Sequence, residues 1–267
     1  MEGIADYRFI EQLGSGSYGT THRALRPERL PVAADHVAVK VLTRRTTPDE
    51  FRSIAEELRL VASIGSEDLL EVYDVGLADG LLYYAMAHCP DGSLDGPGNP
   101  MAPDRPAQAV ADAARGAHAL HEAGIVHRNI KPSNILTIGG RGRLADIGLA
   151  HLQAPGMSST GFGAVESVEF VDPSLLLGTR ASRHTDIWSL GLILHRAVAS
   201  DSAYHGISGK DRLGALREVL HARPVISAAL DGEYRTVVER CIAEDPGRRF
   251  ATAQELALAI ERIAAPI

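Results

Sequence analysis

The chain has 267 residues, of which 45% are hydrophobic and 23% are charged, as in ordinary soluble globular proteins. Its 27 basic and 34 acidic residues give a net charge of −7, which argues against non-specific binding to nucleic acid. No apolar stretch approaches the ~18–20 residues that span a bilayer, and the N-terminus lacks a signal-peptide pattern. Cys89 and Cys241 are too few for a disulfide framework, so we expect a cytoplasmic protein.

The first third of the sequence predicts mainly β-strands. Strand-like residues around 9–13 lead into the glycine-rich segment 14–19, and a second strand-like segment covers 20–25. Val37–Leu42 is a further β-rich run, and two more strands are expected at 69–75 and 81–86.

One helix interrupts these strands. Thr47-Pro48-Asp49-Glu50 has the pattern of a capping box with proline at the first helical position. Apolar residues then recur at helical spacing up to Val61, so the helix is expected to begin near Thr47.

Beyond the Pro- and Gly-rich stretch 90–106, the pattern predicts mainly helices. An alanine-rich helix should cover 107–123 and end at Gly124. The remaining expectations are strands at 135–138 and 143–149, a loop at 150–173, and helices at 186–199, 210–221, 233–244 and 252–263, the last opening with a capping box, Thr252 to Glu255. A β-rich part followed by an α-rich part predicts an α+β, two-lobed fold, with lobes at 1–89 and 90–267.

The glycines of the first part follow the pattern Gly14-x-Gly16-x-x-Gly19. Glycine amides can lie close to phosphates without interference from side chains. A dinucleotide-binding turn would need a helix directly after the last glycine, whereas a strand is expected there. The pattern therefore favours a phosphate-covering hairpin.

Lys40 lies within an apolar run, between Val39 and Val41. A lysine in such a strand needs an anionic partner if its ammonium is desolvated. Glu57 on the predicted helix is the expected partner, and Glu56 is its rival. The alternative is an edge-strand lysine whose stem reaches solvent.

The stretch His127-Arg128-Asn129-Ile130-Lys131-Pro132-Ser133-Asn134, here called the polar loop, resembles the protein-kinase catalytic loop, H-R-D-x-K-P-x-N. Other segments match the family in the same order. They are the glycine motif, Val37-Ala38-Val39-Lys40 for V-A-I-K, Met86–Cys89 for the hinge, Asp146-Ile147-Gly148 for Asp-Phe-Gly, and Asp186-Ile187-Trp188-Ser189-Leu190-Gly191 for D-x-W-S-x-G. The chain is similar to bacterial Ser/Thr kinases of the eukaryotic type.

This resemblance implies a binding site for ATP and Mg²⁺ and assigns a role to each matching residue. Lys40 with Glu57 and the glycine loop would hold the phosphates, with Lys131 neutralising charge on the transferred group. Met86 would be the gatekeeper, with Ala87, His88 and Cys89 as the adenine-binding hinge. Asn134 and Asp146 would hold the metal, and Asp186 would anchor the backbone of the polar loop.

The sequence departs from the family at three places. Asn129 replaces the catalytic Asp and cannot accept a proton. Ile147 replaces Phe, and the usual glutamate partner of the late arginine, here Arg249, is missing, with Asp172 as a candidate substitute. Three hypotheses follow: a pseudokinase that binds nucleotide and acts as a signalling or scaffolding module, a Ser/Thr kinase lineage slowed or inactivated at position 129, and, less favoured, a small-molecule phosphotransferase. A protein partner or protein substrate is expected in the first two.

Two further groups have simple interpretations. His118 and His121 are one helical turn apart, with His127 nearby, but no Cys or carboxylate stands at ligand spacing, so a helix-face position is preferred to a metal site. Ser158–Thr160 and Ser167 could be phosphorylated and contact Arg128, although ordinary loop residues are expected.

Overall fold

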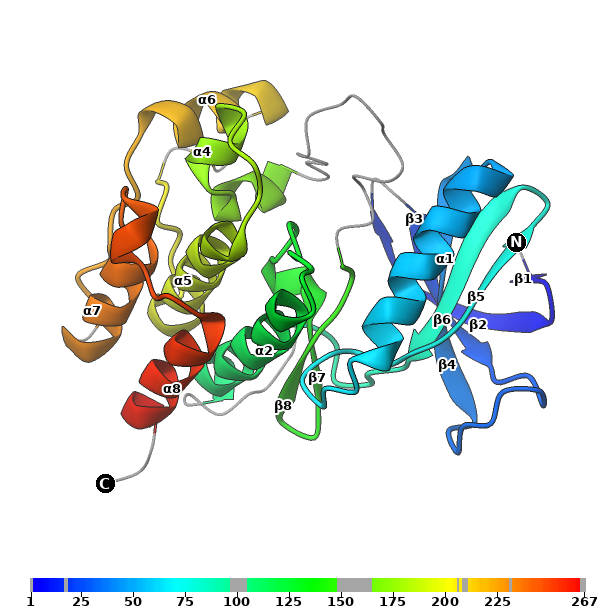
Figure 1. Cartoon of the computed structure of the whole chain (residues 1–267). Coiled ribbons are helices and arrows are strands. Elements are labelled where there is room, and N and C mark those ends of the chain that lie inside the picture. Colours follow the sequence, from blue (N-terminus) through cyan, green and yellow to red (C-terminus); the bar gives the residue numbers. More distant parts are fainter. Residues whose placement is uncertain are drawn as a thin grey trace. The chain divides into compact units, whose positions relative to one another are not determined.

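The computed structural model describes residues 2–16, 19–96, 105–147, 165–205, 207, 211–230 and 232–264. These residues form two compact units, drawn in Figure 1. Unit 1 contains the described residues up to Gly65 together with Leu70–Pro90. Unit 2 contains Ser66–Leu69 and the described residues from Asp91 onward. The predicted α+β class is confirmed, because unit 1 is built mainly of strands and unit 2 mainly of helices.

Unit 1 is a six-stranded antiparallel sheet with the strand order β1-β2-β3-β4-β6-β5. Its strands are β1 (Gly3–Ile4), β2 (Tyr7–Gly16), β3 (Gly19–Leu25), β4 (His36–Arg45), β5 (Val72–Ala78) and β6 (Leu81–Ala87). The strand expected at 69–75 begins three residues later, because Leu69 belongs to unit 2 and makes an isolated bridge with Leu144 of that same unit. The turn before β6 has positive φ at Asp79 and Gly80 (52° and 76°), as two-residue hairpin turns require.

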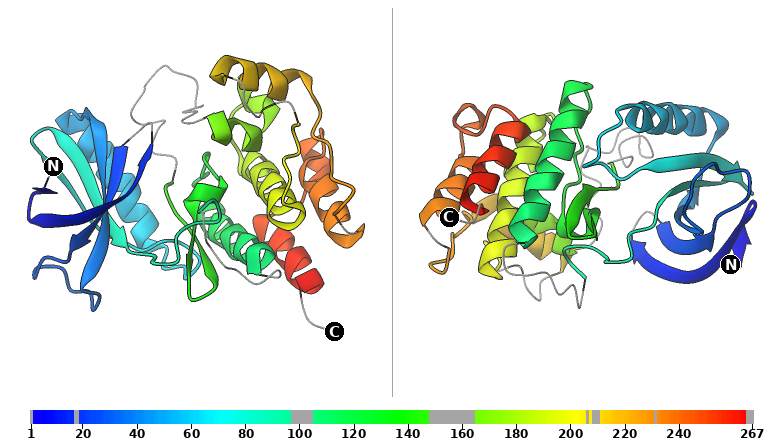
Figure 2. Two further views of the ribbon diagram at one scale, coloured as in Figure 1. Left: turned by 180° about the vertical axis from the view of Figure 1, so that it is seen from behind. Right: turned by 90° about the horizontal axis from the view of Figure 1, so that it is seen from below.

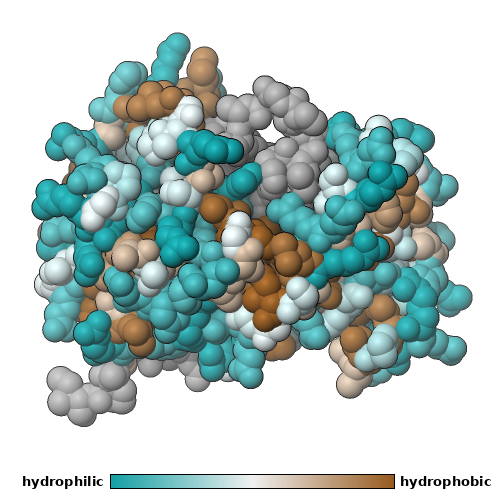
Figure 3. Space-filling view, viewed as in Figure 1, coloured by the Kyte–Doolittle hydropathy of each residue, from teal (hydrophilic) through white to brown (hydrophobic). Residues whose placement is uncertain are grey.

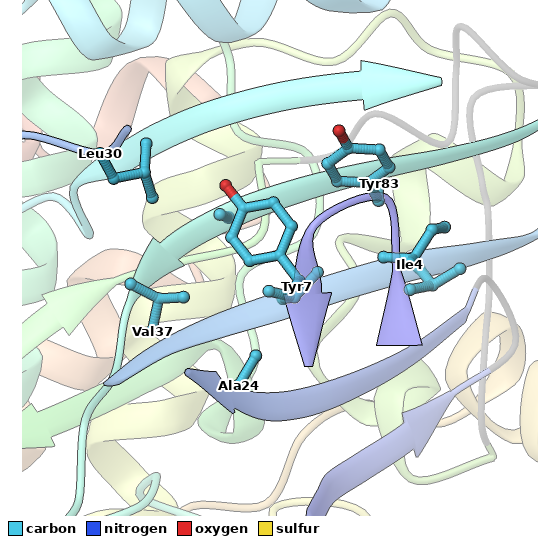
Figure 4. Packing of buried hydrophobic residues seen from close by; sticks show 9 residues of the cluster. Ile4, Tyr7, Ala24, Leu30, Val37 and Tyr83 are labelled. Carbon is cyan, nitrogen blue, oxygen red and sulfur yellow. The ribbon is translucent and has the colours of Figure 1, made fainter. Parts of the chain in front are cut away.

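One face of this sheet carries a compact apolar core, shown in Figure 4. Alternate residues of β4, Val37, Val39 and Val41, point into it, as the two-residue period of a strand dictates. Tyr7 and Tyr83 contribute an edge-to-face aromatic pair with centroids 5.7 Å apart. The intervening residues of β4, including Lys40, therefore face the opposite side of the sheet.

Helix α1 (Pro48–Ser63) begins where the sequence predicts. The Thr47 hydroxyl accepts from Glu50 N at 3.3 Å, and the Glu50 carboxylate accepts from Thr47 N at 2.8 Å. The helix buries Ile54, Ala55, Leu58 and Val61. Since no α1 residue belongs to the core of Figure 4, the helix covers the other face of the sheet, the face that Lys40 shares.

Unit 2 is organised around α2, which packs against α5, α8 and β8 (Figure 2). Its elements are α2 (Arg105–Glu122), η1 (Pro132–Asn134), β7 (Ile135–Ile138), β8 (Arg141–Leu144), η2 (Val165–Phe170), α4 (Pro173–Leu176), α5 (Arg183–Ala199), α6 (Arg212–His221), α7 (Gly232–Cys241), η3 (Pro246–Arg248) and α8 (Ala253–Ala264). Many α2 side chains are alanines that are at most 1% exposed. Such small side chains allow neighbouring backbones to approach closely, and they explain why this helix can be central.

Close approaches of this kind recur at glycines. A Cβ added at Gly142 of β8 would overlap the Ala109 backbone of α2, and one at Gly191 of α5 would overlap Cys241 of α7. Gly191, the last residue of the D-x-W-S-x-G match, is therefore needed for packing.

Two predictions are corrected by local geometry. The strand expected at 143–149 is β8, which runs from Arg141 to Leu144, and it begins early because Gly139 and Gly140 (φ 57° and 79°) form a tight turn after β7. The second capping box is half formed, since Thr252 Oγ1 accepts from Glu255 N at 3.1 Å but the Glu255 carboxylate accepts from Ala251 N.

Candidate functional site

The polar loop is anchored by a buried carboxylate on α5. Asp186, 1% exposed, accepts a hydrogen bond from His127 N at 2.8 Å and from Arg128 N at 2.9 Å. Hydrogen bonds to a charged group contribute about 1.5–3 kcal/mol each. Asp186 thus holds the backbone immediately before Asn129, in the position that the resemblance implies for it.

His121 of α2 completes the environment of Asp186. Its Nε2 lies 2.8 Å from Asp186 Oδ2, and both side chains are at most 2% exposed. Since a carboxylate only accepts, Nε2 carries the proton and donates. Both histidines lie on helix α2, where the His118 side chain is 27% exposed and the His121 side chain is buried beside Asp186. No local pattern distinguishes these two histidines, because the partner of His121 lies 65 residues away.

Two residues of this region have left-handed backbone conformations. Arg128 has φ 68° and Asp146 has φ 59°. For residues other than glycine this conformation costs about 1–3 kcal/mol and persists only where the surroundings enforce it. The Asp186 hydrogen bonds offset the cost at Arg128. Unit 2 therefore holds two residues of its candidate site, Arg128 and Asp146, in an unfavourable backbone conformation.

Asn129 is held by its backbone. Its N–H donates to His127 Nδ1 at 3.3 Å, and its carbonyl accepts from Asn134 Nδ2 at 2.8 Å. His127 is buried, and its Nε2 lies 3.0 Å from Ala145 O. Burial lowers the pKa of His127, and the hydrogen bond that Nδ1 accepts requires the neutral ring. Neutral His127 has one N–H, on Nε2, and one acceptor, on Nδ1, as these two contacts require.

Asn134 and Asp146 lie side by side in unit 2. The bond from Ala145 N to Asn134 O, 2.8 Å, places Asp146 next to Asn134. Because Asn134 Nδ2 is used by Asn129 O, its Oδ1 is the end of the amide left for another ligand. An amide oxygen beside a carboxylate is a pair of hard oxygen ligands that fits Mg²⁺.

In unit 1 the glycine motif forms the predicted hairpin. Gly14 pairs with Thr21 and Gly16 pairs with Gly19, so a strand and not a helix follows the motif. A Cβ at Gly19 would overlap Val41 O, whereas one at Gly14 or Gly16 would meet nothing within 4 Å. The sheet itself therefore requires Gly19, while the protein's own packing does not require glycine at the other two positions.

Lys40 lies on β4, between β3 and β6, so the edge-strand alternative is wrong. It is half-buried and lies opposite Thr21 and Tyr84 in the sheet. Of the two candidate partners on α1, Glu57 is half-buried and Glu56 is exposed. Burial therefore favours Glu57 as the residue that faces the sheet.

The predicted hinge, Met86–Cys89, begins within the last two residues of β6. Met86 is 5% exposed and pairs with Ala38 of β4 and Val72 of β5. Ala87 N donates to Glu71 O at 2.9 Å, so this N–H is already used within unit 1. His88 and Cys89 are half-buried, and burial lowers the pKa of His88.

The ion pair of the late arginine is rebuilt. Arg249 Nη1 donates to Asp172 Oδ2 at 2.5 Å, with both side chains at most 3% exposed. Asp172 Oδ1 also accepts from Ser174 N at 2.9 Å and so caps α4. Arg249 further donates to the carbonyls of Ala243 and His184 and lies over the Trp188 ring. Asp172 is therefore the substitute for the missing glutamate.

A further buried carboxylate, Asp112, was not predicted. Asp112, fully buried on α2, accepts from Gly142 N at 2.8 Å, Arg141 Nε at 3.0 Å and Gln108 Nε2 at 2.9 Å. Burial would raise the pKa of Asp112, but these hydrogen bonds together lower it. The carboxylate fixes the start of β8, the strand that leads to Asp146. The sequence signal that could have indicated this buried carboxylate is a single Asp among the alanines of α2.

Some predictions fall outside the described residues. Gly148 and Ser158–Thr160 are not among them, and nothing is described of the Ser167 side chain. In the part of the chain that the structure describes, no group of three or more His, Cys, Asp or Glu residues could hold a metal ion. Among the described helices, none is both long enough and apolar enough to cross a membrane.

Residues 7–258 match the family model described as protein kinase domain. The Ser/Thr-protein kinase PknJ of Mycobacterium tuberculosis is 29% identical over 272 residues, which cover 95% of this chain and 44% of that protein. PknB of the same organism is 27% identical over 275 residues, covering 96% of this chain and 42% of the relative. The chain spans less than half the length of these relatives.

A solved structure shares the fold. The crystal structure of the PknI kinase domain from Mycobacterium tuberculosis superposes with a TM-score of 0.71 at 23% identity, covering 99% of each chain.

Proposed function

Because the chain belongs to the protein kinase domain family, we propose that it binds Mg·ATP and transfers the phosphoryl group weakly or not at all. The observation that carries this proposal is Asn129, which stands where the family has its catalytic Asp. The backbone of Asn129 is held by His127 and Asn134. The position is therefore ordered, but its side chain is an amide that cannot take a proton.

The magnitude of the loss is set by the chemistry. General-base contributions are typically ~10²–10⁴-fold, whereas phosphoryl transfer depends mostly on positioning and electrostatic stabilisation. Asn134 and Asp146 would hold Mg²⁺, which supplies positive charge beside the phosphates when it is bound. Lys40 and Lys131 would add charge through their ammonium groups. The chain would then act as a signalling or scaffolding module that binds nucleotide.

The basic residues of the whole sequence support nucleotide binding. Only three of the 27 are lysines, namely Lys40, Lys131 and Lys210, and all the others are arginines. Lys and Arg are not interchangeable where a compact ammonium is needed. A chain that uses arginine almost everywhere keeps lysine at both positions that match the family's phosphate-handling lysines.

The second candidate is a Ser/Thr kinase lineage with low activity. It is favoured by the intact geometry of the polar loop and by the names of the relatives, which are Ser/Thr kinases. In this case the replacement of Asp by Asn129 is the main cause of low activity, and the other site residues can still support phosphoryl transfer.

Lysine reactivity tests nucleotide binding directly. The protein is acylated with an amine-reactive reagent with and without Mg·ATP, and modification is measured at each lysine by mass spectrometry. We expect protection of Lys40 and Lys131 relative to Lys210, together with a higher melting temperature, because a ligand that binds the native state stabilises it. Lys40→Arg should abolish the thermal shift. Equal acylation and an unchanged melting temperature at millimolar Mg·ATP would contradict the proposal.

Asn129→Asp separates the two candidates. Autophosphorylation or peptide phosphorylation that appears only in Asn129→Asp identifies a kinase lineage with a single lesion. A variant that still binds Mg·ATP and transfers nothing identifies a module that has diverged further. Slow activity of the unsubstituted protein is accepted only if mass spectrometry shows no deamidation of Asn129, because traces of Asp would mimic it.

A further inference from the structure

Helix α6 displays its larger apolar side chains to solvent. It buries Ala215 and Val219. Leu213 is 58% exposed, Leu220 is 37% exposed and Leu216 is half-buried. A surface helix ordinarily turns its apolar side chains toward the core, so the exposure of Leu213 and Leu220 on α6 is unusual.

The three leucines form one stripe. Spacings of three and four residues place Leu213, Leu216 and Leu220 on one side of a helix. We call them the leucine stripe. In the space-filling view, hydrophobic residues gather at the surface of unit 2 in the place where Figure 1 draws α6 (Figure 3). Large exposed apolar side chains that lie together mark interaction sites.

The neighbouring element α4 is followed by another exposed leucine. Helix α4 packs against α6, and Leu177, directly after α4, is 77% exposed. Its turn is ordered by three backbone hydrogen bonds, from Leu177 N and Thr179 N to Ser174 O and from Gly178 N to Leu175 O. Gly178, with φ 89°, provides the left-handed residue that the turn needs. Leu177 is thus held outward by a regular turn.

The charges beside the stripe are positive. Arg212 and Arg217 flank it on either side and are exposed, as is Arg180 after α4. None of these three arginines makes an ion pair with another residue in the described ranges. Unpaired guanidinium groups on both sides of an apolar stripe complement an acidic, apolar ligand.

We propose that the leucine stripe, with Leu177, is a docking surface for an acidic amphipathic helix of a protein partner. Leu213 to Leu220 spans two helical turns, about 10 Å at 1.5 Å per residue, and fits apolar anchors at i, i+3 and i+7 of the partner helix. Carboxylates beside those anchors meet Arg212 and Arg217. The surface lies on α6, which packs against η2, the segment that leads to Asp172.

The test uses a designed helical peptide with leucines at i, i+3 and i+7 and glutamates on both flanks. Binding to the full chain is measured by fluorescence anisotropy, with the same peptide carrying glutamine for glutamate as the charge control. We expect binding that weakens as salt rises, because the attraction between exposed charges is screened. Leu213→Asp with Leu220→Asp should weaken it about tenfold or more, and Arg212→Glu with Arg217→Glu should also weaken it.

Leu258→Asp is the matched control, since Leu258 is a 46% exposed leucine on α8. It should leave peptide binding unchanged. The far-UV circular dichroism and the melting temperature of the stripe variants, measured without nucleotide, show whether the fold persists and keep this proposal separate from the nucleotide proposal. No binding by the unsubstituted protein, or equal binding by the stripe variants, overturns it. Self-association in sedimentation experiments that the stripe variants abolish would also overturn it, because the occupant would then be a second copy of this chain.

Discussion

Arg249 and Asp172 form a buried ion pair, 2.5 Å between Nη1 and Oδ2, across 77 residues of sequence. The pair ties the start of α4 to the segment after η3. Since Arg249 also donates to two backbone carbonyls and lies over Trp188, its charge is compensated on several sides. The Asp172 carboxylate is the acidic partner of this guanidinium.

Asp172→Asn should therefore destabilise the protein strongly. Removing one member of a buried pair leaves the other charge uncompensated, which typically costs about 3–5 kcal/mol. Asparagine keeps an oxygen for the cap on Ser174, so the loss reports the ion pair. Asp95→Asn is the control, because Asp95 is 40% exposed and pairs with Arg196 at 3.4 Å. Urea unfolding measures both, and similar small losses would show that the buried pair contributes little.

His121→Leu should loosen the polar loop through Asp186. Loss of a hydrogen bond to a charged group costs about 1.5–3 kcal/mol, and the amides of His127 and Arg128 should exchange hydrogen faster. His121→Gln, which can donate from Nε2, should restore part of the protection. The comparison variant is His118→Leu on the same helix, which should leave these amides unchanged. A fall in melting temperature without faster exchange at these two amides would argue against a positioning role.

Gly191→Ala should destabilise the contact between α5 and α7. The added methyl overlaps Cys241 Cβ, and overpacking in a core typically costs about 1–3 kcal/mol. Gly232→Ala serves as the control, because a Cβ there meets nothing within 4 Å. Thermal unfolding distinguishes them. Equal stability of the two variants would mean that α7 can move away from α5 at little cost and make room for the added methyl group.

Stability should fall as the pH is lowered through the range in which histidine titrates. Burial lowers the pKa values of His127 and His195 in the folded protein, so the unfolded chain binds more protons below about pH 6.5. Their contribution is fully present above that pH and decreases below it, by about 1.4 kcal/mol per pH unit for each histidine that remains neutral in the folded protein.

His195→Gln should reduce this pH dependence. His195 Nε2 accepts from Ser227 N at 2.9 Å, and the glutamine oxygen can accept the same hydrogen bond without titrating. His205→Gln is the control, because His205 is exposed. Urea unfolding at about pH 8 and about pH 5, on either side of the ordinary histidine pKa, gives the slopes. An unchanged slope in His195→Gln would show that His195 is not among the responsible groups.

Much of the fold and site could be predicted because the signals are local. The capping box at Thr47, the apolar period of α1 and the glycine turn after α2 each depend on residues within a few positions of one another. The order of the motifs, with Asn129 in place of Asp, likewise needs only the linear sequence. These features determine the element types, the α+β class and the resemblance to kinases.

Only the tertiary structure decided which residues meet. His118 and His121 look alike on their helix, yet only His121 reaches Asp186, and Asp172 was one candidate until Arg249 was seen beside it. The exposure of Leu213 and Leu220 likewise depends on what packs against α6. The physical reason is common to all three, because the partner of a buried charge and the burial of an apolar side chain depend on residues far away in sequence. The spacing of residues along the chain indicates which helix or strand they form, but it does not indicate which distant residues they contact.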